Sequence, residues 1–244
     1  MDVQNKVVII TGASSGIGLA TAKLLSRHGA KIALVSRSKE KLEMLSQELP
    51  NSLAVPADMT KMIEIKRMVE QTEAHFGRVD ILINNAGQGY DAPVEKIDVE
   101  IFHYIFDLDV VGPVVAMQQV IPLMRKQGEG AIINISSGTA LMHLPNMSAY
   151  ASIKRALADI SLTAREEIKG DNIAVSVVYP YITLTDFEKN TIRYAADYQD
   201  QEGTGPVPAN TAEYVAQKIL DGVVSGEAEI FAHDWMRKMA KGDS

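Results

Sequence analysis

A tyrosine and a lysine lie four residues apart in Tyr150-Ala-Ser-Ile-Lys154, near the start of a segment with helical periodicity. Residues at this spacing share one face of a helix. A free tyrosine has a pKa of about 10 and is a poor acid or base near neutrality. Because a neighbouring ammonium favours the phenolate, we expect Lys154 to lower the pKa of Tyr150. The pair could transfer protons, although most pairs at this spacing are ordinary surface pairs.

A serine precedes this pair by thirteen residues and directly follows an apolar run. If that run is a parallel strand, Ser137 lies at its carboxyl end, facing the crevice where such sheets bind ligands. Its hydroxyl could hold a carbonyl or alcohol oxygen while Tyr150 transfers the proton. Hydride would then pass directly between a bound nicotinamide and the substrate carbon.

A glycine-rich turn, Thr11-Gly-Ala-Ser-Ser-Gly-Ile-Gly18, connects the first apolar run to a helical segment. Gly12 permits a tight turn, Gly16 lets the backbone approach a ligand, and Gly18 allows close helix–strand packing. The amino end of the helix offers free N–H groups to a pyrophosphate. A plain glycine-rich loop is the alternative. The residues of the turn expected to bind a cofactor are Gly12, Ser14, Ser15, Gly16, Ile17 and Gly18.

The second apolar run ends in Ser36-Arg37-Ser38-Lys39, with no carboxylate that could bind an adenine ribose diol. Arg37 instead offers a planar fork suited to a phosphate, which favours NADP(H) over NAD(H). A solvent-facing arginine is the alternative. Asp58, followed by Met59, comes after a third short run and could accept a hydrogen bond from the adenine amino group or cap the next helix.

Short apolar runs rich in β-branched residues recur along the chain, as expected for strands buried on both faces. They alternate with segments that carry one apolar stripe at helical spacing. This order predicts one Rossmann-type α/β domain over residues 1–244, with a doubly wound parallel sheet and helices on both faces. The predicted strands are 6–11, 31–36, 52–55, 80–84, 131–136 and 174–179, and the predicted helices are 17–28, 38–49, 60–76, 98–127, 150–169 and 210–225.

The composition excludes several classes of protein. The 244 residues contain no cysteine, which excludes disulfides, thiolate metal sites and a cysteine nucleophile. A hydrophobic share of 46% with 23% charged residues is typical of a soluble globular protein. The net charge of −7 argues against nucleic acid as a partner. We find no apolar run of membrane-spanning length and no secretory signal, and therefore expect a cytoplasmic protein.

With these motifs in order, the sequence from Lys6 to about Phe231 resembles the short-chain dehydrogenase/reductase family. Asn84-Asn-Ala-Gly87 resembles the family's sheet-stabilising motif, which places Asn85, Ala86 and Gly87 near the cofactor. The resemblance implies that Tyr150 is the general acid/base, that Lys154 binds the nicotinamide ribose and tunes Tyr150, and that Ser137 orients the substrate oxygen. It also implies a homodimer or homotetramer packed through residues 98–127 and 150–169.

One departure from the family concerns catalysis. An Asn-x-x-Gly stretch is usual where this chain has Asp109-Val-Val-Gly112. The family's main chain there holds a water that links the lysine to solvent. A carboxylate near Lys154 should stabilise the ammonium and offset part of its effect on Tyr150, so we expect a catalytic Asp109 and a shifted pH profile. The alternative is that Asp109 points elsewhere.

A second departure follows the predicted strand 174–179. The family favours Pro-Gly and then Thr, whereas this chain has Pro180-Tyr181-Ile-Thr-Leu-Thr185. Pro180, Thr183 and Thr185 can still meet the carboxamide and phosphates of the cofactor. Tyr181 either narrows the pocket or packs under a lid. The polar, irregular stretch 183–208 is the predicted lid over the substrate.

Several further residues are weaker candidates. His143 could touch the substrate or be solvated, and Tyr194 and Tyr198 with Ile192 could form the inner face of the lid or an ordinary helix stripe. The histidines show no metal-ligand spacing, so we expect no metal. The short basic tail after His233 is expected to fray.

The sequence thus predicts an NADP(H)-dependent oxidoreductase that interconverts a carbonyl and an alcohol of a small molecule, working as a reductase. One alternative is an NAD(H)-linked alcohol dehydrogenase. The other is a catalytically weakened NADP-binding regulatory protein, for which Asp109 is the only support.

Overall fold

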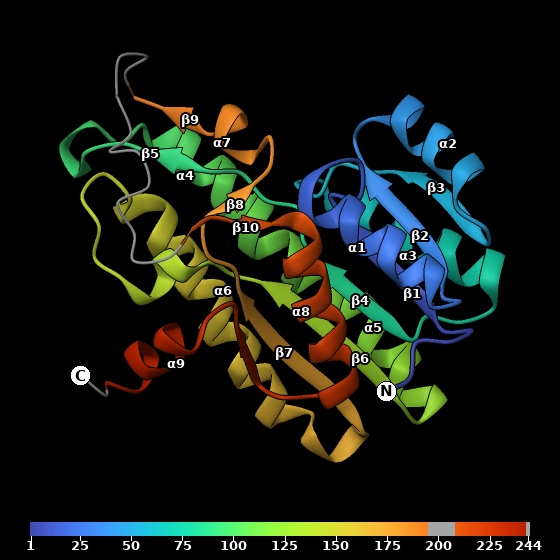
Figure 1. Cartoon of the computed structure of the whole chain (residues 1–244). Coiled ribbons are helices and arrows are strands. Elements are labelled where there is room, and N and C mark those ends of the chain that lie inside the picture. Colours follow the sequence, from blue (N-terminus) through green and yellow to red (C-terminus); the bar gives the residue numbers. More distant parts are fainter. Residues whose placement is uncertain (195–207, 243–244) are drawn as a thin grey trace.

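Parallel strands form one central seven-stranded sheet in the computed structural model, which describes residues 1–194 and 208–242 (Figure 1). The strand order is β11-β7-β6-β4-β1-β2-β3, and every pairing in the sheet is parallel. The doubly wound Rossmann-type fold is therefore confirmed. The strands are β1 (Val7–Thr11), β2 (Lys31–Ser36), β3 (Ser52–Pro56), β4 (Ile81–Asn84), β6 (Gly130–Ile135), β7 (Ile173–Tyr179) and β11 (Glu229–Phe231).

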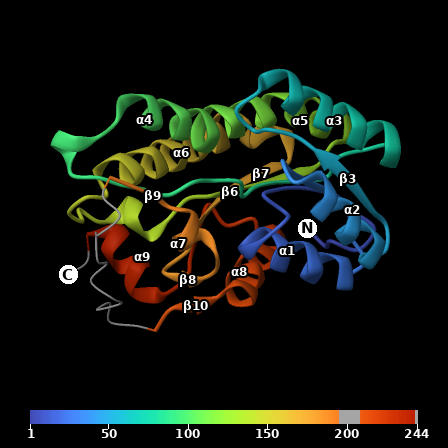
Figure 2. The same ribbon diagram turned by 90° about the horizontal axis from the view of Figure 1, so that it is seen from above.

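Helices cover both faces of this sheet, as the view from above shows (Figure 2). Successive residues of a strand point to opposite faces, so Ile10 packs with one helix layer and Ile9 with the other. One layer holds α1 (Gly16–Arg27), α2 (Lys39–Glu48) and α8 (Ala212–Ser225), and the other holds α3 (Met62–Phe76), α4 (Val99–Phe106), α5 (Gly112–Gln127) and α6 (Ser148–Glu167).

The segment predicted as one helix over 98–127 is interrupted by a π-helical turn, Asp107–Val111, between α4 and α5. A π turn inserts one extra residue into a helix and often lies at a functional site. Here the turn contains Asp109, whose side chain is buried. Gly112 ends it, and any Cβ at Gly112 would collide with the main-chain oxygen of Met59. The turn therefore sits tightly against the chain that follows β3.

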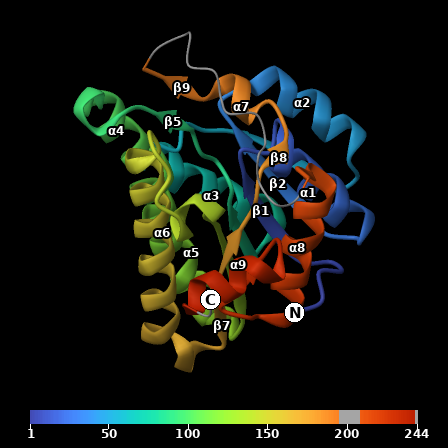
Figure 3. The same cartoon turned by 60° about the vertical axis from the view of Figure 1, so that its left-hand side comes forward.

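The first part of the lid lies above the carboxyl ends of the central strands (Figure 3). It contains β8 (Thr183–Leu184), α7 (Phe187–Asn190) and β9 (Ile192–Arg193). β8 pairs with β10 (Asn210–Thr211), and β9 pairs with β5 (Tyr90–Asp91), so the lid is attached to the body at two places. Tyr198 lies outside the described residues. No helix in the described ranges is long and apolar enough to cross a bilayer.

The expectation that the tail after His233 frays is wrong. Residues Asp234–Lys241 form α9, and the side chain of Met236 is fully buried. A Cβ on Gly138 would lie 2.8 Å from the Met236 methyl group, so the tail packs directly behind the turn that follows Ser137. The ring of Trp235 meets Tyr181 edge-on, with 5.4 Å between ring centroids. Burial of these apolar side chains offsets the weak helix propensity of so short a segment.

Replacing Met236 by alanine should therefore destabilise the protein. Truncation of a buried methionine typically costs about 2–5 kcal/mol in the free energy of unfolding. Met239→Ala is the matched control, because Met239 lies one turn further along α9 with 44% of its surface exposed. Urea unfolding of both variants measures the difference, and equal stabilities would show that α9 contributes nothing to the core.

Candidate active site

The glycine-rich turn is held in place by Asn85. The Asn85 side-chain amide donates to the main-chain oxygen of Thr11 at 2.9 Å, and the Thr11 hydroxyl accepts the N–H groups of Asn85 and Ala86 at 2.9 and 3.0 Å. Gly12 adopts a φ of 69°, which glycine tolerates best. A Cβ on Gly18 would collide with the oxygen of Gly12 and lie 2.6 Å from the Asn85 amide. The turn is thus closed against β4.

This turn suits the phosphates of a dinucleotide. α1 begins at Gly16, and its first turn contains no acidic side chain, so its free N–H groups meet no competing carboxylate. A Cβ on Gly16 would lie 3.3 Å from the Thr185 side chain, so the lid packs closely against the main chain of Gly16 and leaves little room for a side chain there. Among the turn residues, the side chain of Ser15 is exposed, and those of Ser14 and Ile17 are half-buried.

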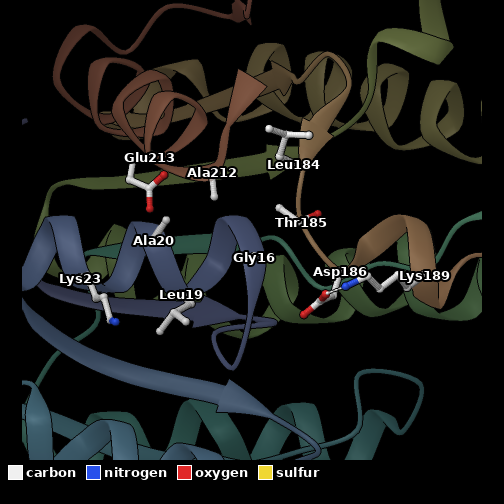
Figure 4. Close-up of a pocket in the computed structure, with 10 residues that line it drawn as sticks. All are labelled: Gly16, Leu19, Ala20, Lys23, Leu184, Thr185, Asp186, Lys189, Ala212 and Glu213. Atoms are coloured by element: carbon white, nitrogen blue, oxygen red, sulfur yellow. Dashed lines mark hydrogen bonds and ion pairs between the residues drawn. The ribbon is translucent and has the colours of Figure 1, made fainter. Parts of the chain in front are cut away.

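A hollow of about 510 Å³ adjoins this turn, between α1, the lid and the start of α8 (Figure 4). Gly16, Thr185 and Glu213 line it, together with the ion pair of Asp186 and Lys189 at 2.9 Å. None of the residues proposed to do chemistry lines it. The hollow therefore adjoins the glycine-rich turn and is not lined by Ser137, Tyr150 or Lys154.

Arg37 and Asp58 lie beyond the ends of β2 and β3, respectively. Arg37 is exposed and donates to the hydroxyl of Tyr104 at 3.1 Å, which orients its guanidinium. Asp58 accepts from both the N–H and the hydroxyl of Thr60, at 2.9 and 2.8 Å. Burial raises the pKa of Asp58, but the Thr60 hydrogen bonds and the charges of Arg37 and Lys61 outweigh it and hold the pKa low. Met59 is buried.

Ser137 and Tyr150 come together beside the carboxyl end of β6. The Ser137 hydroxyl accepts from the N–H and the hydroxyl of Thr139 at 3.2 and 2.9 Å, and a hydrogen bond links it to Tyr150. Burial raises the pKa of Tyr150. The charge of Lys154 and the hydrogen bond from Ser137 lower this pKa, whereas the charge of Asp109 raises it, and the result lies above the usual value for tyrosine. Lys154 acts in the expected direction, but its effect is outweighed.

Lys154 forms a buried ion pair with Asp109. The Nζ of Lys154 lies 2.8 Å from Oδ2 of Asp109 and donates to the oxygen of Ile135 at 3.1 Å. Oδ1 of Asp109 accepts the N–H of Gln88 at 3.1 Å. The alternative that Asp109 points elsewhere is therefore wrong. Burial raises the pKa of Asp109; burial also lowers the pKa of Lys154, but the carboxylate outweighs it and keeps that pKa raised.

Gly87 explains how the ion pair fits beneath the Asn-Ala-Gly turn. A Cβ at this position would lie 2.9 Å from the Asp109 carboxylate and 3.2 Å from the Lys154 ammonium. Pro180 is buried on the other side of the site, where its oxygen accepts the N–H of Gly138 at 2.7 Å. The hydroxyl of Thr183 donates to the oxygen of Tyr181 at 2.7 Å.

Three residues that the sequence did not single out lie next to this group: Phe187, Gln88 and Gly89. The ring of Phe187 lies 6.0 Å from that of Tyr150, centroid to centroid. Phe187 is the one phenylalanine in the polar stretch 183–208, which was a usable signal. Nothing local distinguishes Gln88 or Gly89, because their contacts to the lid come from residues about a hundred positions away.

The weaker candidates are placed as follows. Ile192 packs with the core beside α4 and α6, Tyr194 is mostly exposed, and His143 is exposed in the loop before α6. Tyr181 packs against Trp235 and His233 of the C-terminal segment. In the part of the chain that the structure describes, no cluster of three His, Cys, Asp or Glu side chains could hold a metal ion.

Residues 6–195 match the model of the short chain dehydrogenase family. The chain belongs to this family. An 11-beta-hydroxysteroid dehydrogenase-like protein of Arabidopsis thaliana is 32% identical over 242 residues, which cover 97% of this chain and 76% of that protein. The match to the family model ends before β10, so α8, β11 and α9 lie beyond it.

Solved structures of short-chain dehydrogenases agree with the fold. One from Streptomyces avermitilis superposes with a TM-score of 0.87 at 26% identity, covering 99% of this chain and 93% of that one. A 3-ketoacyl-(acyl-carrier-protein) reductase from Brucella melitensis, complexed with NADH, gives 0.83 at 27% identity, covering 94% and 97%. As a member of the family, the protein is an oxidoreductase that uses a nicotinamide cofactor and acts on CH–OH groups of small molecules.

Proposed function

We propose that the protein is an NADP(H)-dependent reductase that converts a carbonyl to an alcohol, with Tyr150 as the general acid. The observation that carries the proposal is the group formed by the buried Tyr150 and Lys154 with the half-buried Ser137 beside the carboxyl end of β6. A carbonyl oxygen between the Ser137 and Tyr150 hydroxyls would receive two hydrogen bonds there.

A nicotinamide cofactor, when bound, supplies the hydride to the carbonyl carbon, or accepts it in the reverse direction. Tyr150 donates its phenolic proton to the oxygen, and the O–H bond of the alcohol forms as that of the phenol breaks. Ser137 holds the same oxygen. Burial and the Asp109 carboxylate favour the neutral phenol of Tyr150, which is the form that donates a proton in reduction.

The cofactor would lie across the ends of β1, β2 and β4. The glycine turn and the amino end of α1 would bind the pyrophosphate, and Arg37 the 2′-phosphate. Lys154 and Tyr150 would meet the nicotinamide ribose. The remaining contacts would come from Asp58 and Met59 near the adenine, from Asn85, Ala86 and Gly87, and from Pro180, Thr183 and Thr185 at the carboxamide and phosphates.

Two alternatives remain as proposals of lower rank. The Brucella reductase was solved with NADH, which favours an NAD(H)-linked enzyme. A weakened regulatory protein has less support, because Asp109 pairs with Lys154 without displacing it from Tyr150, over whose ring the ammonium lies at 5.8 Å.

We also infer a cytoplasmic homodimer or homotetramer that packs through α4, α5 and α6. Val99 of α4 and Ile160 of α6 expose 58% and 37% of their surface, and association would cover them.

The wild-type protein should oxidise NADPH when supplied with a ketone, aldehyde or quinone that it accepts. Tyr150→Phe should still bind NADPH, with at most the loss of one hydrogen bond to the nicotinamide ribose, but should lose at least about a hundredfold in kcat, since the proton donor is removed. Absorbance at the NADPH band measures turnover, and fluorescence measures binding. NADPH binding without turnover across a broad panel would favour the regulatory protein.

Arg37→Ala should weaken NADPH about tenfold or more and leave NADH nearly unchanged, because a charge-assisted hydrogen bond to the 2′-phosphate is lost. Lys39→Ala is the matched control: Lys39 lies two residues away and already pairs with Glu43 at 3.7 Å. The measurement is the dissociation constant of NADPH and of NADH for the wild-type protein and for both variants. An unchanged NADPH preference in Arg37→Ala would refute the assignment of NADP(H).

Asp109→Asn should move the pH profile to lower pH. The Asp109 carboxylate raises the pKa of Tyr150, so its removal lowers that pKa. Reduction requires the phenol and would fail at lower pH than in wild type, while oxidation requires the phenolate and would begin at lower pH. Asp107→Asn is the control, since Asp107 is exposed on the same π turn. Coincident profiles, or a shift to higher pH, would contradict the role of Asp109.

A further inference from the structure

An exposed aromatic ring lies beside the proposed proton donor. Phe187 begins α7, 41% of its surface is exposed, and its ring centroid lies 6.0 Å from that of Tyr150 at an angle of 50°. A single exposed apolar side chain needs no explanation by itself. Here the ring lies beside that of Tyr150, whose hydroxyl a substrate oxygen must reach in the proposed function, so we expect a substrate that reacts there to contact it.

The position of Phe187 is fixed by the attachment of the lid. The side-chain amide of Gln88 donates to the oxygen of Asn190, and the N–H of Ile192 donates to the oxygen of Gly89 at 3.0 Å. A Cβ on Gly89 would collide with Thr191 and lie 3.1 Å from Cε1 of Phe187. The absence of a side chain at Gly89 therefore lets the lid pack closely enough to bring the ring beside Tyr150.

The charges of this part of the lid are already paired. Lys189 pairs with Asp186 at 2.9 Å, and Arg193 pairs with Glu188 at 3.3 Å and with Asp91 at 3.8 Å. Both cations between residues 183 and 194 thus have carboxylate partners. An anionic substrate would have to compete with those carboxylates, whereas a neutral apolar group would not.

We propose that Phe187 is the specificity-determining residue of the lid and that the substrate is a neutral ketone or aldehyde with a flat apolar group on the carbonyl carbon. This rests on the proposed function. When the oxygen of such a substrate lies at Tyr150 and Ser137, its apolar group contacts the Phe187 ring, which an aromatic or fused-ring group can stack against. A small aliphatic ketone reacts through the same hydroxyls but gains little from that ring.

The test compares three carbonyl substrates with NADPH: an aryl methyl ketone, butan-2-one and acetoacetate. We expect wild-type kcat/KM to be about tenfold or more higher for the aryl ketone than for either other substrate. Phe187→Ala should lose about tenfold for the aryl ketone, mainly through KM, and less than about threefold for butan-2-one. Phe187→Leu should fall between, because it keeps apolar area without a flat ring.

Leu184→Ala is the matched control. Leu184 is an apolar lid residue, 69% exposed, that lines the hollow beside α1, which Tyr150 does not line (Figure 4). Its substitution should leave the ratio of kcat/KM for the aryl ketone to kcat/KM for butan-2-one as in wild type. Dissociation constants for NADPH and the melting temperature of each variant separate loss of specificity from loss of cofactor or fold.

The outcomes are distinguishable. Two outcomes would overturn this inference while leaving the reductase proposal intact. One is a Phe187→Ala variant whose ratio of kcat/KM for the aryl ketone to that for butan-2-one equals the wild-type ratio, and the other is a wild-type preference for acetoacetate. A wild-type protein that binds NADPH but reduces no carbonyl compound would overturn the proposed function and this inference together.

Discussion

The buried ammonium of Lys154 is the interaction on which the arrangement of the site depends. An unpaired charge in the interior would be strongly unfavourable, so each neighbour must supply an acceptor. The oxygen of Ile135 at the end of β6 and the carboxylate of Asp109 on the π turn do so. The hydroxyl of Ser136 also donates to the oxygen of Lys154 at 2.8 Å, which ties α6 to the sheet at the same point. Strand, helix and turn are therefore aligned by one charged group, and Gly87 has to lack a side chain to cover it.

The sheet order explains why this group and the glycine turn meet. β1 lies between β4 and β2 in the sheet. The chain first adds β2 and β3 on one side of β1, and then crosses over to add β4, β6, β7 and β11 on the other side. At such a reversal the loops leave on opposite faces and open a crevice at the carboxyl ends of the strands. Asn85, directly after β4, closes the glycine turn at that reversal. One residue before Asn85, at the end of β4, the side-chain amide of Asn84 donates to Asn134 at 2.8 Å, and Asn134 donates to Ser161 at 2.7 Å. This buried chain of hydrogen bonds connects the cofactor side with α6.

The parts that the sequence predicted are those set by local periodicity and by motifs of adjacent residues. The six predicted strands and the helical segments arise from alternation of short β-branched runs with apolar stripes, and the glycine turn carries its geometry in its own residues. The features that the sequence did not predict have non-local causes. α9 forms because Met236 fills a space beside Gly138, about a hundred residues earlier, which no window of sequence shows. The pKa of Tyr150 rises because burial outweighs the adjacent lysine, and burial depends on the whole fold. The roles of Gln88 and Gly89 depend on their contacts with the lid, which is about a hundred residues away in the sequence.

The same electrostatics connect the ion pair to the direction of the reaction. A lysine alone beside Tyr150 would favour the phenolate and suit removal of a proton from an alcohol. With Asp109 at 2.8 Å, the net charge of the pair is close to zero, and burial then decides in favour of the neutral phenol. A neutral phenol is a proton donor, and the substrate that uses it gains a proton on its oxygen. The Asp109 carboxylate balances the charge of Lys154 and the Phe187 ring adds none, so in the proposed function both suit the surroundings of Tyr150 to a neutral carbonyl compound rather than to an ionised one.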